Sequence, residues 1–371
     1  WSPTAAELDA YLVKRSVRFN DDDSAYLNWT PSSAGNRRTW TFSCWVKRAG
    51  LGTNDNVFEV NGASAIATNL QIQFHNGDYL SVDYGGAFYL KTDAVYRDSS
   101  AFYHIVLAVD TTQATDTNRM KLYINGSQVT SFDQTNYPSQ HDDLAINSVA
   151  EHLIGGEGLS YFDGLISDVH FCDGIQLDPT SFAETDATTG QWIPKEYTHV
   201  ASPNDGTTWS GTVTESEGSG WYSGNTPAYG FNNNISSTMK TQNASTITFT
   251  PASGIPYTSS VEIYQDRVQT GATINGNAVT TPGTANAWNT LTTGSGTLNS
   301  LTVTNNVSTV IAAIRIDGKQ LIDGLSGDNS FHLAMDPDES GTNYSQYLTS
   351  SGTTSSHGPA AAFGGTIWDM S

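Results

Sequence analysis

Four polar segments of the chain combine carboxylates and amides with aromatic or imidazole rings, residue types that can bind a ligand. The segments are Asn20–Asp23 with Tyr26 and Trp29, Asn54–Asn56, His141–Asp143, and Tyr161–Asp163. Carboxylate and amide oxygens accept hydrogen bonds from hydroxyl groups, and an aromatic ring covers the apolar face of a ligand. Closely spaced Asp and Asn residues also supply the oxygens that calcium prefers. The segments therefore indicate binding of a hydroxyl-rich ligand or a hard cation, with solvated acidic turns as the alternative.

No arrangement typical of a catalytic site accompanies these segments. Two carboxylates spaced as E-x-D-x-x-E on one strand can act together on a glycosidic bond, but the chain contains no such string, nor G-x-S-x-G, H-E-x-x-H or a P-loop. The nearest approach runs from Glu262 to Asp266, where alternation turns Glu262 outward. His104 and His170 lie in predicted strands and are interpreted as solvated or hydrogen-bonded rather than as ligands. We therefore expect no enzyme activity, and polysaccharide degradation is the less favoured alternative.

The length and composition predict a multidomain all-β protein. The chain has 371 residues, enough for two to three domains. Hydrophobic residues make up 37% of it and aromatic residues 11%, while Gly, Thr, Ser and Asn are abundant and helix formers are few. That balance is typical of short strands joined by turns.

The charge of the chain argues against nucleic acid as a partner. Its 37 Asp and Glu residues outnumber 16 Lys and Arg, which gives a formal charge of -21 without any basic patch. No apolar run approaches the roughly 20 residues of a membrane-spanning helix, so we expect no membrane insertion. The sequence shows no signal peptide, and because it begins at Trp1 we expect it to be part of a longer protein.

The clearest local element is a predicted hairpin. Apolar residues alternate with their neighbours over 105–109 and 120–124, which indicates two strands. A polar loop separates the two strands, and Asn125 and Gly126, which follow the second strand, accept the positive φ of a type I′ turn that reverses the chain between Ile124 and Gln128. Further short strands separated by polar turns fill residues 16–179, and their number predicts two sheets packed face to face.

The two cysteines are expected to stay reduced. Cys44 should face inward with Trp40 and Phe42 on a predicted strand, whereas alternation from the inward Phe171 turns Cys172 outward. Side chains on different faces of a sheet are too poorly placed for a disulfide. Two reduced thiols fit a chain that is not exported through an oxidising compartment.

Five separated motifs carry a resemblance to a known superfamily. In chain order they are TFSCWVKR, FHNGDYLSV, FYHIVLAVD with KLYINGSQV, LIGG, and FDGLISDVHFCDGIQLDP. Their order and spacing resemble the laminin G-like, concanavalin A-like lectin superfamily, with Tyr103 where tryptophan is usual. The resemblance implies an antiparallel β-sandwich over residues 16–179.

The chain is expected to have five segments. A capping box of Thr4 and Glu7 predicts a short helix or linker at the start. The pattern P-A-x-x-F-x-x-x-I occurs twice, at Pro227 and at Pro359, about the length of one domain apart. This repeat predicts that a new module begins near the end of the chain. The expected segments are the helix or linker 1–15, the lectin-like sandwich 16–179, a linker 180–210, a second, smaller β-sandwich 211–325, and the start of a further repeat module 326–371.

The resemblance also implies where ligands bind. Sugar sites of lectins with this fold lie in loops at one edge of the sandwich. The candidate carbohydrate-binding residues are Asp21, Asp23, Trp29, Asp55, His141, Asp143 and Tyr161. Many laminin G-like domains hold calcium through aspartates and backbone carbonyls, which makes Asp142 and Asp143 the candidate metal ligands. Calcium is the one cofactor expected.

The modular plan resembles the tail-fibre, head-fibre and adhesin proteins of marine bacteriophages. It implies a non-enzymatic fibre, adhesin or decoration protein on the virion surface, or alternatively on a cell surface, that binds host polysaccharide or lipopolysaccharide. Other virion proteins are expected partners, and a homo-oligomer, preferably a trimer, would raise avidity. The alternative is a purely structural β-sandwich module of a particle or surface filament that binds no sugar.

Overall fold

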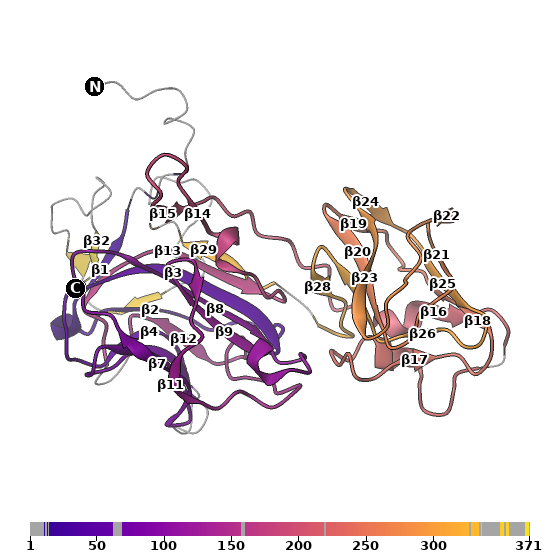
Figure 1. Ribbon diagram of the computed structural model, residues 1–371, viewed down its shortest axis with the longest axis horizontal. Coiled ribbons are helices and arrows are strands. Elements are labelled where there is room, and N and C mark those ends of the chain that lie inside the picture. Colours follow the sequence, from indigo (N-terminus) through magenta and orange to yellow (C-terminus); the bar gives the residue numbers. More distant parts are fainter. Residues whose placement is uncertain are drawn as a thin grey trace. The chain divides into compact units, whose positions relative to one another are not determined.

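The computed structural model divides the chain into two compact units (Figure 1). The first comprises Trp1–His199 and Asn329–Ser371, and the second Val200–Asp328. The described part of both units contains strands, turns and 3-10 helices and no α-helix, which confirms the predicted all-β class. The residues described are Tyr11, Val13, 15–61, 69–156, 160–218, 220–325, 328–333, Met335, and the strand backbones 349–351, 354–355 and 368–370.

One large sheet of the first unit is built around its longest strands. Its order is β10-β9-β8-β3-β13-β1-β32-β31, and β29 also pairs with β13. The strands are β1 (Val17–Phe19), β3 (Thr39–Arg48), β8 (Tyr103–Asp110), β9 (Met120–Ile124), β10 (Ser127–Gln128), β13 (Gly164–Asp173), β29 (Phe331–Leu333), β31 (Thr354–Ser355) and β32 (Trp368–Met370).

The second large sheet of this unit forms the other layer of the sandwich (Figure 1). Its order is β11-β7-β6-β5-β4-β12-β2-β30, with antiparallel pairing throughout. The strands are β2 (Tyr26–Trp29), β4 (Asp55–Asn61), β5 (Leu70–Phe74), β6 (Tyr79–Tyr84), β7 (Ala87–Val95), β11 (Phe132–Thr135), β12 (Glu151–Ile154) and β30 (Thr349–Ser351).

Aromatic and β-branched side chains from both sheets meet in one core. As predicted, β3 turns Trp40, Phe42, Cys44 and Val46 inward, and all four are fully buried. Phe42 stacks on Phe58 from the facing sheet with ring centroids 4.2 Å apart. Alternation along each strand thus turns one set of side chains into this core and the other set outward.

The predicted hairpin between β9 and β10 is confirmed. Asn125 and Gly126 have φ of 49° and 79°, as a type I′ turn requires. The Asn125 side chain also accepts a hydrogen bond from the backbone N–H of His104, 2.8 Å away. Turn geometry thus accounts for Asn125.

Residues 175–199 cover part of the outer face of the first sheet. They include η4 (Pro179–Ser181), β14 (Ala183–Thr185) and β15 (Trp192–Pro194). Phe182 packs with Val106 and Cys172 in a small separate core. Cys172 therefore points out of the sandwich, as predicted, yet is buried, while Cys44 lies in the main core. No disulfide joins the two cysteines.

The chain returns to the first unit after the second unit. Strand β29 pairs with residues 169–171 of β13, whereas β1 pairs with residues 164–166 of the same strand. The register of β13 against β3 shifts between Ser167 and His170, which marks a bulge where the two partners meet. The described strands of segment 326–371 thus belong to the sheets of the first unit.

The second unit has its own core beneath several smaller sheets. Apolar residues such as Ile247, Phe249, Val261, Ile263 and Ile314 fill that core. Its elements are η5 (Trp209–Thr212), β16 (Val213–Glu215), η6 (Pro227–Gly230), β17 (Met239–Lys240), β18 (Ser245–Phe249), β19 (Ile255–Tyr257), β20 (Ser260–Gln265), β21 (Gly271–Ile274), β22 (Asn277–Ala278), β23 (Ala287–Thr293), β24 (Gly296–Leu298), β25 (Leu301–Asn305), β26 (Val310–Ile311), β27 (Ala313–Ile316) and β28 (Lys319–Gln320).

Two sequence predictions fall outside the described residues. The expected helix at the start of the chain lies almost wholly in residues 1–14, of which Tyr11 and Val13 alone are described. The second copy of the repeat, 359–367, is likewise outside them. Within the described part, no helix has the length and apolar character needed to cross a lipid bilayer.

Candidate functional site

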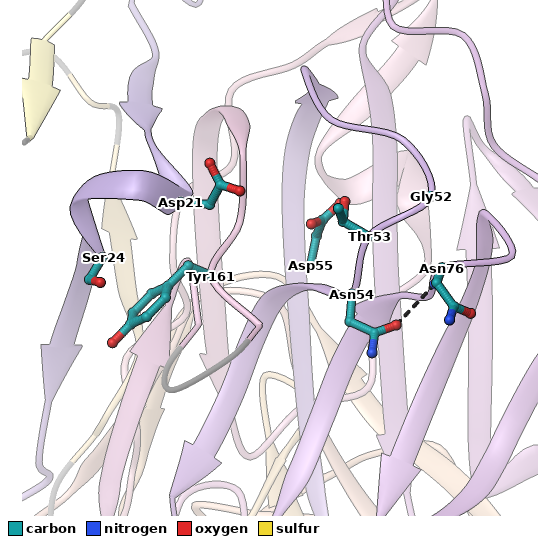
Figure 2. Close-up of a pocket in the computed structure, with 8 residues that line it drawn as sticks. All are labelled: Asp21, Ser24, Gly52, Thr53, Asn54, Asp55, Asn76 and Tyr161. Atoms are coloured by element: carbon teal, nitrogen blue, oxygen red, sulfur yellow. Dashed lines mark hydrogen bonds between the residues drawn. The ribbon is translucent and has the colours of Figure 1, made fainter.

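A polar pocket of about 450 Å³ opens among loops at one edge of the first unit's sandwich. We call it the edge pocket. Figure 2 shows Asp21, Ser24 and Tyr161 on one side of it and Asn54 and Asn76 on the other. Its lining residues are Asp21, Ser24, Gly52, Thr53, Asn54, Asp55, Asn76 and Tyr161.

A short helical turn presents Asp21 to the edge pocket. Residues Asp21–Asp23 form the 3-10 helix η1, which ends at Ser24 with a left-handed φ of 56°. The Asn20 amide donates to the Asp23 carboxylate at 2.6 Å, which closes the turn. Because Asp23 is held in this way, Asp21 is the acid of the turn that lines the pocket.

A buried arginine fixes the loop on the other side. Arg48 is fully buried and donates to Asp55 at 3.2 Å, to Asp78 at 3.1 Å and to the carbonyl of Tyr96 at 2.9 Å. Asp78 in turn accepts the backbone N–H of Gly52 at 2.9 Å. The loop 50–55 is thus tied to a charged network beneath it.

The two acids of this network differ in their proton affinity. Burial raises the pKa of Asp55, against the opposing effects of Thr53 and Arg48. For Asp78, burial also favours the neutral form, but hydrogen bonds from Arg97, Gly52 and Arg48 outweigh it and leave the pKa lowered. The two pKa shifts have opposite signs because hydrogen bonds to the charged form outweigh burial at Asp78, whereas burial outweighs them at Asp55.

Tyr161 supplies an aromatic surface to the edge pocket. Its ring stacks on Tyr26, with centroids 6.3 Å apart and planes 23° from parallel. Across the pocket, the Asn54 side-chain oxygen accepts the backbone N–H of Asn76 at 3.0 Å (Figure 2). This bond uses the Asn54 side-chain oxygen as an acceptor, and the N–H groups of the same amide are donors at the lining of the pocket.

The structure brings together three of the residues predicted from the sequence, Asp21, Asp55 and Tyr161. It adds Ser24, Thr53, Asn54 and Asn76. Asn54 belongs to one of the polar segments singled out in the sequence, but Asn76 belongs to the tight turn between β5 and β6. In the sequence, turn formation alone accounts for an asparagine at this position. Only the fold shows that this turn faces the loop 50–55.

The prediction that Trp29 contacts a sugar is wrong. Its position in β2 turns the side chain into the core, where it is 8% exposed. Its ring lies 4.3 Å from His152 and 4.9 Å from Phe331, centroid to centroid. Strand alternation therefore makes Trp29 a core residue, although it follows an acidic loop in the sequence.

His141, Asp142 and Asp143 do not line the edge pocket. The Asp143 carboxylate accepts two hydrogen bonds from the Arg38 guanidinium, at 2.8 and 3.3 Å. The Asp142 carbonyl accepts the hydroxyl of Thr111 at 2.8 Å. A calcium ion at Asp143 would have to displace Arg38, and calcium binding here stays a prediction.

A second pocket, of about 280 Å³, lies on the outer face of β5, β6 and β7. Within it, His75 contacts the Asp83 carboxylate at 3.0 Å, and its ring stacks on Tyr79 with centroids 4.8 Å apart. The lining residues are Asn69, Gln71, Gln73, His75, Asp83, Gly86, Phe88 and Ser160. These are the outward positions of predicted strands, and their polarity alone did not distinguish them from a solvated sheet face.

Comparison with protein families finds one match. Residues 21–176 match the model of a laminin G family described as the concanavalin A-like lectin/glucanases superfamily. Comparison with curated proteins gives no match.

Several solved structures are similar to part of the chain. A native heptameric SAP-like pentraxin from Limulus polyphemus is 14% identical with a TM-score of 0.33, over 44% of this chain and 77% of that one. A carbohydrate-binding protein from Bacteroides ovatus, so described provisionally, is 13% identical with a TM-score of 0.31, over 50% and 58%. The sialidase module CBM40 of Ruminococcus gnavus, bound to α2,3-sialyllactose, is 16% identical with a TM-score of 0.30, over 42% and 89%.

The family match and the observed architecture agree over the same residues. The matched range spans β2 to β13, which supply most of both sheets and the lining of the edge pocket. Residues 21–176 therefore match a laminin G family of the concanavalin A-like lectin/glucanases superfamily in sequence, and they supply most of a two-layered β-sandwich.

Proposed function

We propose that the first unit binds glycans in the edge pocket. The observation that carries this proposal is the mixture of groups in that pocket, where carboxylates, amides and hydroxyls converge beside one tyrosine ring. Sugars present hydroxyl groups around an apolar ring face. Polar side chains can accept or donate hydrogen bonds to the hydroxyls, while an aromatic ring covers the apolar face.

Preorganisation supports the same proposal. The buried Arg48 holds Asp55 and, through Asp78, the backbone of Gly52. A loop that is fixed before binding loses less conformational entropy when a ligand arrives. The lectin-like fold of the domain is consistent with such a pocket at a loop edge.

The pocket is open and polar, so a single copy should bind weakly. We therefore propose that the chain acts in several copies, as a trimeric or other homo-oligomeric fibre, adhesin or decoration protein of a virion. Its ligand would then be polysaccharide or lipopolysaccharide on a host cell, and multivalency would supply the avidity. The acidic charge of -21 fits a protein exposed to salt, where it keeps the surface soluble.

The test is a glycan array followed by titration of the best-retained oligosaccharide against the full chain and its variants. We expect Tyr161→Ala to weaken binding about fivefold to tenfold, because a stacked ring contributes roughly 1 kcal/mol. Asp21→Asn should weaken binding while leaving the thermal midpoint unchanged, because Asp21 is exposed.

Tyr229→Ala is the matched control, since this tyrosine of the second unit is 42% exposed and lies outside the pocket. Equal affinities for Tyr161→Ala and Tyr229→Ala would place the sugar elsewhere. If the folded protein retained no glycan on the array, the result would favour the alternative of a purely structural β-sandwich module that binds no sugar.

A further inference from the structure

Three metal-ligating side chains meet on the first sheet, apart from both pockets. They are Asp168 and His170 of β13 and His332 of β29, and one ligand atom from each lies within 4.8 Å of the others. The Nε2 atoms of His332 and His170 are 2.8 and 3.3 Å from Asp168 Oδ1. This is the one such group of three among the described residues.

The bulge in β13 assembles the group. Asp168 has a left-handed φ of 47° at the point where the register against β3 shifts. A bulge re-aims a side chain that a regular strand would turn the other way. His170 lies directly opposite His332 in the β13–β29 pair, and the two rings stack with centroids 4.1 Å apart.

The group is buried and includes a carboxylate oxygen that lacks a hydrogen bond. Asp168 is 1% exposed and His170 is fully buried. Asp168 Oδ2 forms no hydrogen bond with any described residue, and the contact given for His170 Nε2 is the one with Asp168 Oδ1 at 3.3 Å. Buried polar atoms in this state are costly unless an ion or a water molecule satisfies them.

We propose that Asp168, His170 and His332 bind a divalent transition metal ion of the zinc type. Two imidazole nitrogens and one carboxylate oxygen are a donor set for zinc and its neighbours, whereas calcium and magnesium prefer oxygen alone. Donors on one tetrahedral zinc ion lie roughly 3.3 Å apart, given bond lengths of about 2.0–2.1 Å. The His170 Nε2–Asp168 Oδ1 distance of 3.3 Å matches that spacing, and the His332 Nε2–Asp168 Oδ1 distance of 2.8 Å would have to lengthen by about 0.5 Å.

Neighbouring side chains orient the ligands. His199 Nε2 lies 3.3 Å from His170 Nδ1, on the side of the ring away from Asp168, and the Tyr11 hydroxyl donates to Asp168 Oδ1 at 2.8 Å. Such outer contacts fix ring orientation around bound metals. The side chain of His332 is 22% exposed, so its ring has room to turn toward a shared ion. A water molecule completes the four ligands.

The ion would join strands 164 positions apart in the sequence, β13 and β29. It would stabilise the returning segment of the first unit, because a metal that binds only the folded state shifts the folding equilibrium.

The test uses the full chain, stripped with a chelator and then titrated with Zn²⁺ or Co²⁺. We expect one ion per chain by native mass spectrometry and the visible absorption of cobalt in a low-symmetry nitrogen and oxygen site. At a hundredfold excess over Kd, zinc should raise the thermal midpoint by about 5 °C or more.

His332→Gln should abolish the absorption and the shift, since it removes a ligand at a half-buried position, and circular dichroism of the metal-free variant checks that it still folds. His75→Gln is the control, because His75 also contacts an aspartate at 3.0 Å but has no third ligand there. Absence of a stoichiometric ion in the unaltered protein, or binding undiminished in His332→Gln, would overturn the proposal.

Discussion

At His104 and His152, the surrounding groups determine which ring nitrogen carries the proton. The Trp192 indole donates to His104 Nδ1 at 3.0 Å, so Nε2 holds the hydrogen that faces Ser43 Oγ, 2.9 Å away. His152 is the reverse. Its Nε2 accepts the Asn147 backbone N–H at 2.9 Å, and its Nδ1 donates to the Ala150 carbonyl at 2.8 Å.

Both histidines should make the protein sensitive to acid. Burial lowers the pKa of His104 to about 3 and that of His152 to about 4. Because the unfolded chain binds these protons near pH 6.5, stability is full above that pH. It falls as the pH drops toward 4, by up to about 1.4 kcal/mol per pH unit for each histidine. Urea unfolding across this range measures the slope, and an NMR titration of His152 with a midpoint near 6.5 would contradict the prediction.

Arg48 should matter more to stability than any exposed arginine. Replacing it with Met leaves Asp55 and Asp78 buried without their shared partner, which should cost about 3–5 kcal/mol of unfolding free energy. Arg97→Met removes a second partner of Asp78, but that arginine side chain is 61% exposed and should cost below about 1 kcal/mol. Equal denaturant midpoints for the two variants would show that the buried Arg48 contributes no more to the free energy of unfolding than the exposed Arg97.

The residue types of the edge pocket could be predicted from the sequence more readily than their positions. Asp21, Asp55 and Tyr161 stood out because acids, amides and an aromatic ring share polar segments. Trp29 follows one of the same polar segments but lies in the core, because the alternation along β2 turns its side chain inward. Residue type signals chemistry, whereas exposure depends on which face of a strand a position occupies.

Among the elements, β12 is followed by two glycines with positive φ, Gly155 and Gly156. Gly156 has a φ of 88°, and a Cβ there would lie 2.3 Å from the Ser160 carbonyl oxygen. Ser160 precedes Tyr161, and its carbonyl accepts the Asn56 backbone N–H at 2.9 Å. Gly156 thus permits the close approach of Ser160, the residue before Tyr161 of the edge pocket.

Gly156→Ala should therefore destabilise the first unit by about 2 kcal/mol or more and weaken glycan binding together with it. Chemical denaturation and oligosaccharide titration measure the two effects. Gly271→Ala is the control, because a Cβ at that position meets open space. A neutral Gly156→Ala would show that the turn adjusts freely.

Elements with a local signal could be predicted, and those without one could not. The hairpin at Asn125-Gly126 was predicted because its turn chemistry is contained in two residues. The bulge in β13 was not, although the core residues Ile166 and Val169 are three positions apart, because the neighbouring Leu165 also permits a regular alternation with Val169 and Phe171. The role of residues 175–199 as a cover was also missed, since polar loops and covering segments have similar composition.

For the whole molecule, the first unit depends on a segment that returns from far along the chain. Phe331 of β29 packs against Trp29 and Phe171, with ring centroids 4.9 and 5.9 Å away. Phe331→Ala should cost about 3–4 kcal/mol and lower the melting of the first unit while leaving that of the second unchanged. Calorimetry separates the two transitions, and a shift confined to the second unit would contradict this dependence. Val307→Ala, at a residue 68% exposed in the second unit, is the control.

The return itself could not be predicted from the sequence. Segment 326–371 was expected to begin a further module, because a short repeat pattern recurs within it. Pairing between β29 and β13 joins positions more than 150 residues apart, and no local periodicity records such a partner. The sandwich core, in contrast, follows from alternation within each strand.

The pairing of β29 with β13 also imposes an order on synthesis. β13 emerges from the ribosome long before β29, with the whole second unit made between them. At a synthesis rate of roughly 5–20 residues per second, residues 169–171 of β13 remain unpaired for on the order of ten seconds before β29 is made. Neighbouring nascent chains on one messenger expose the same unpaired backbone groups during that interval. Translation speed, rather than folded stability, then governs how often a chain pairs with its own β29.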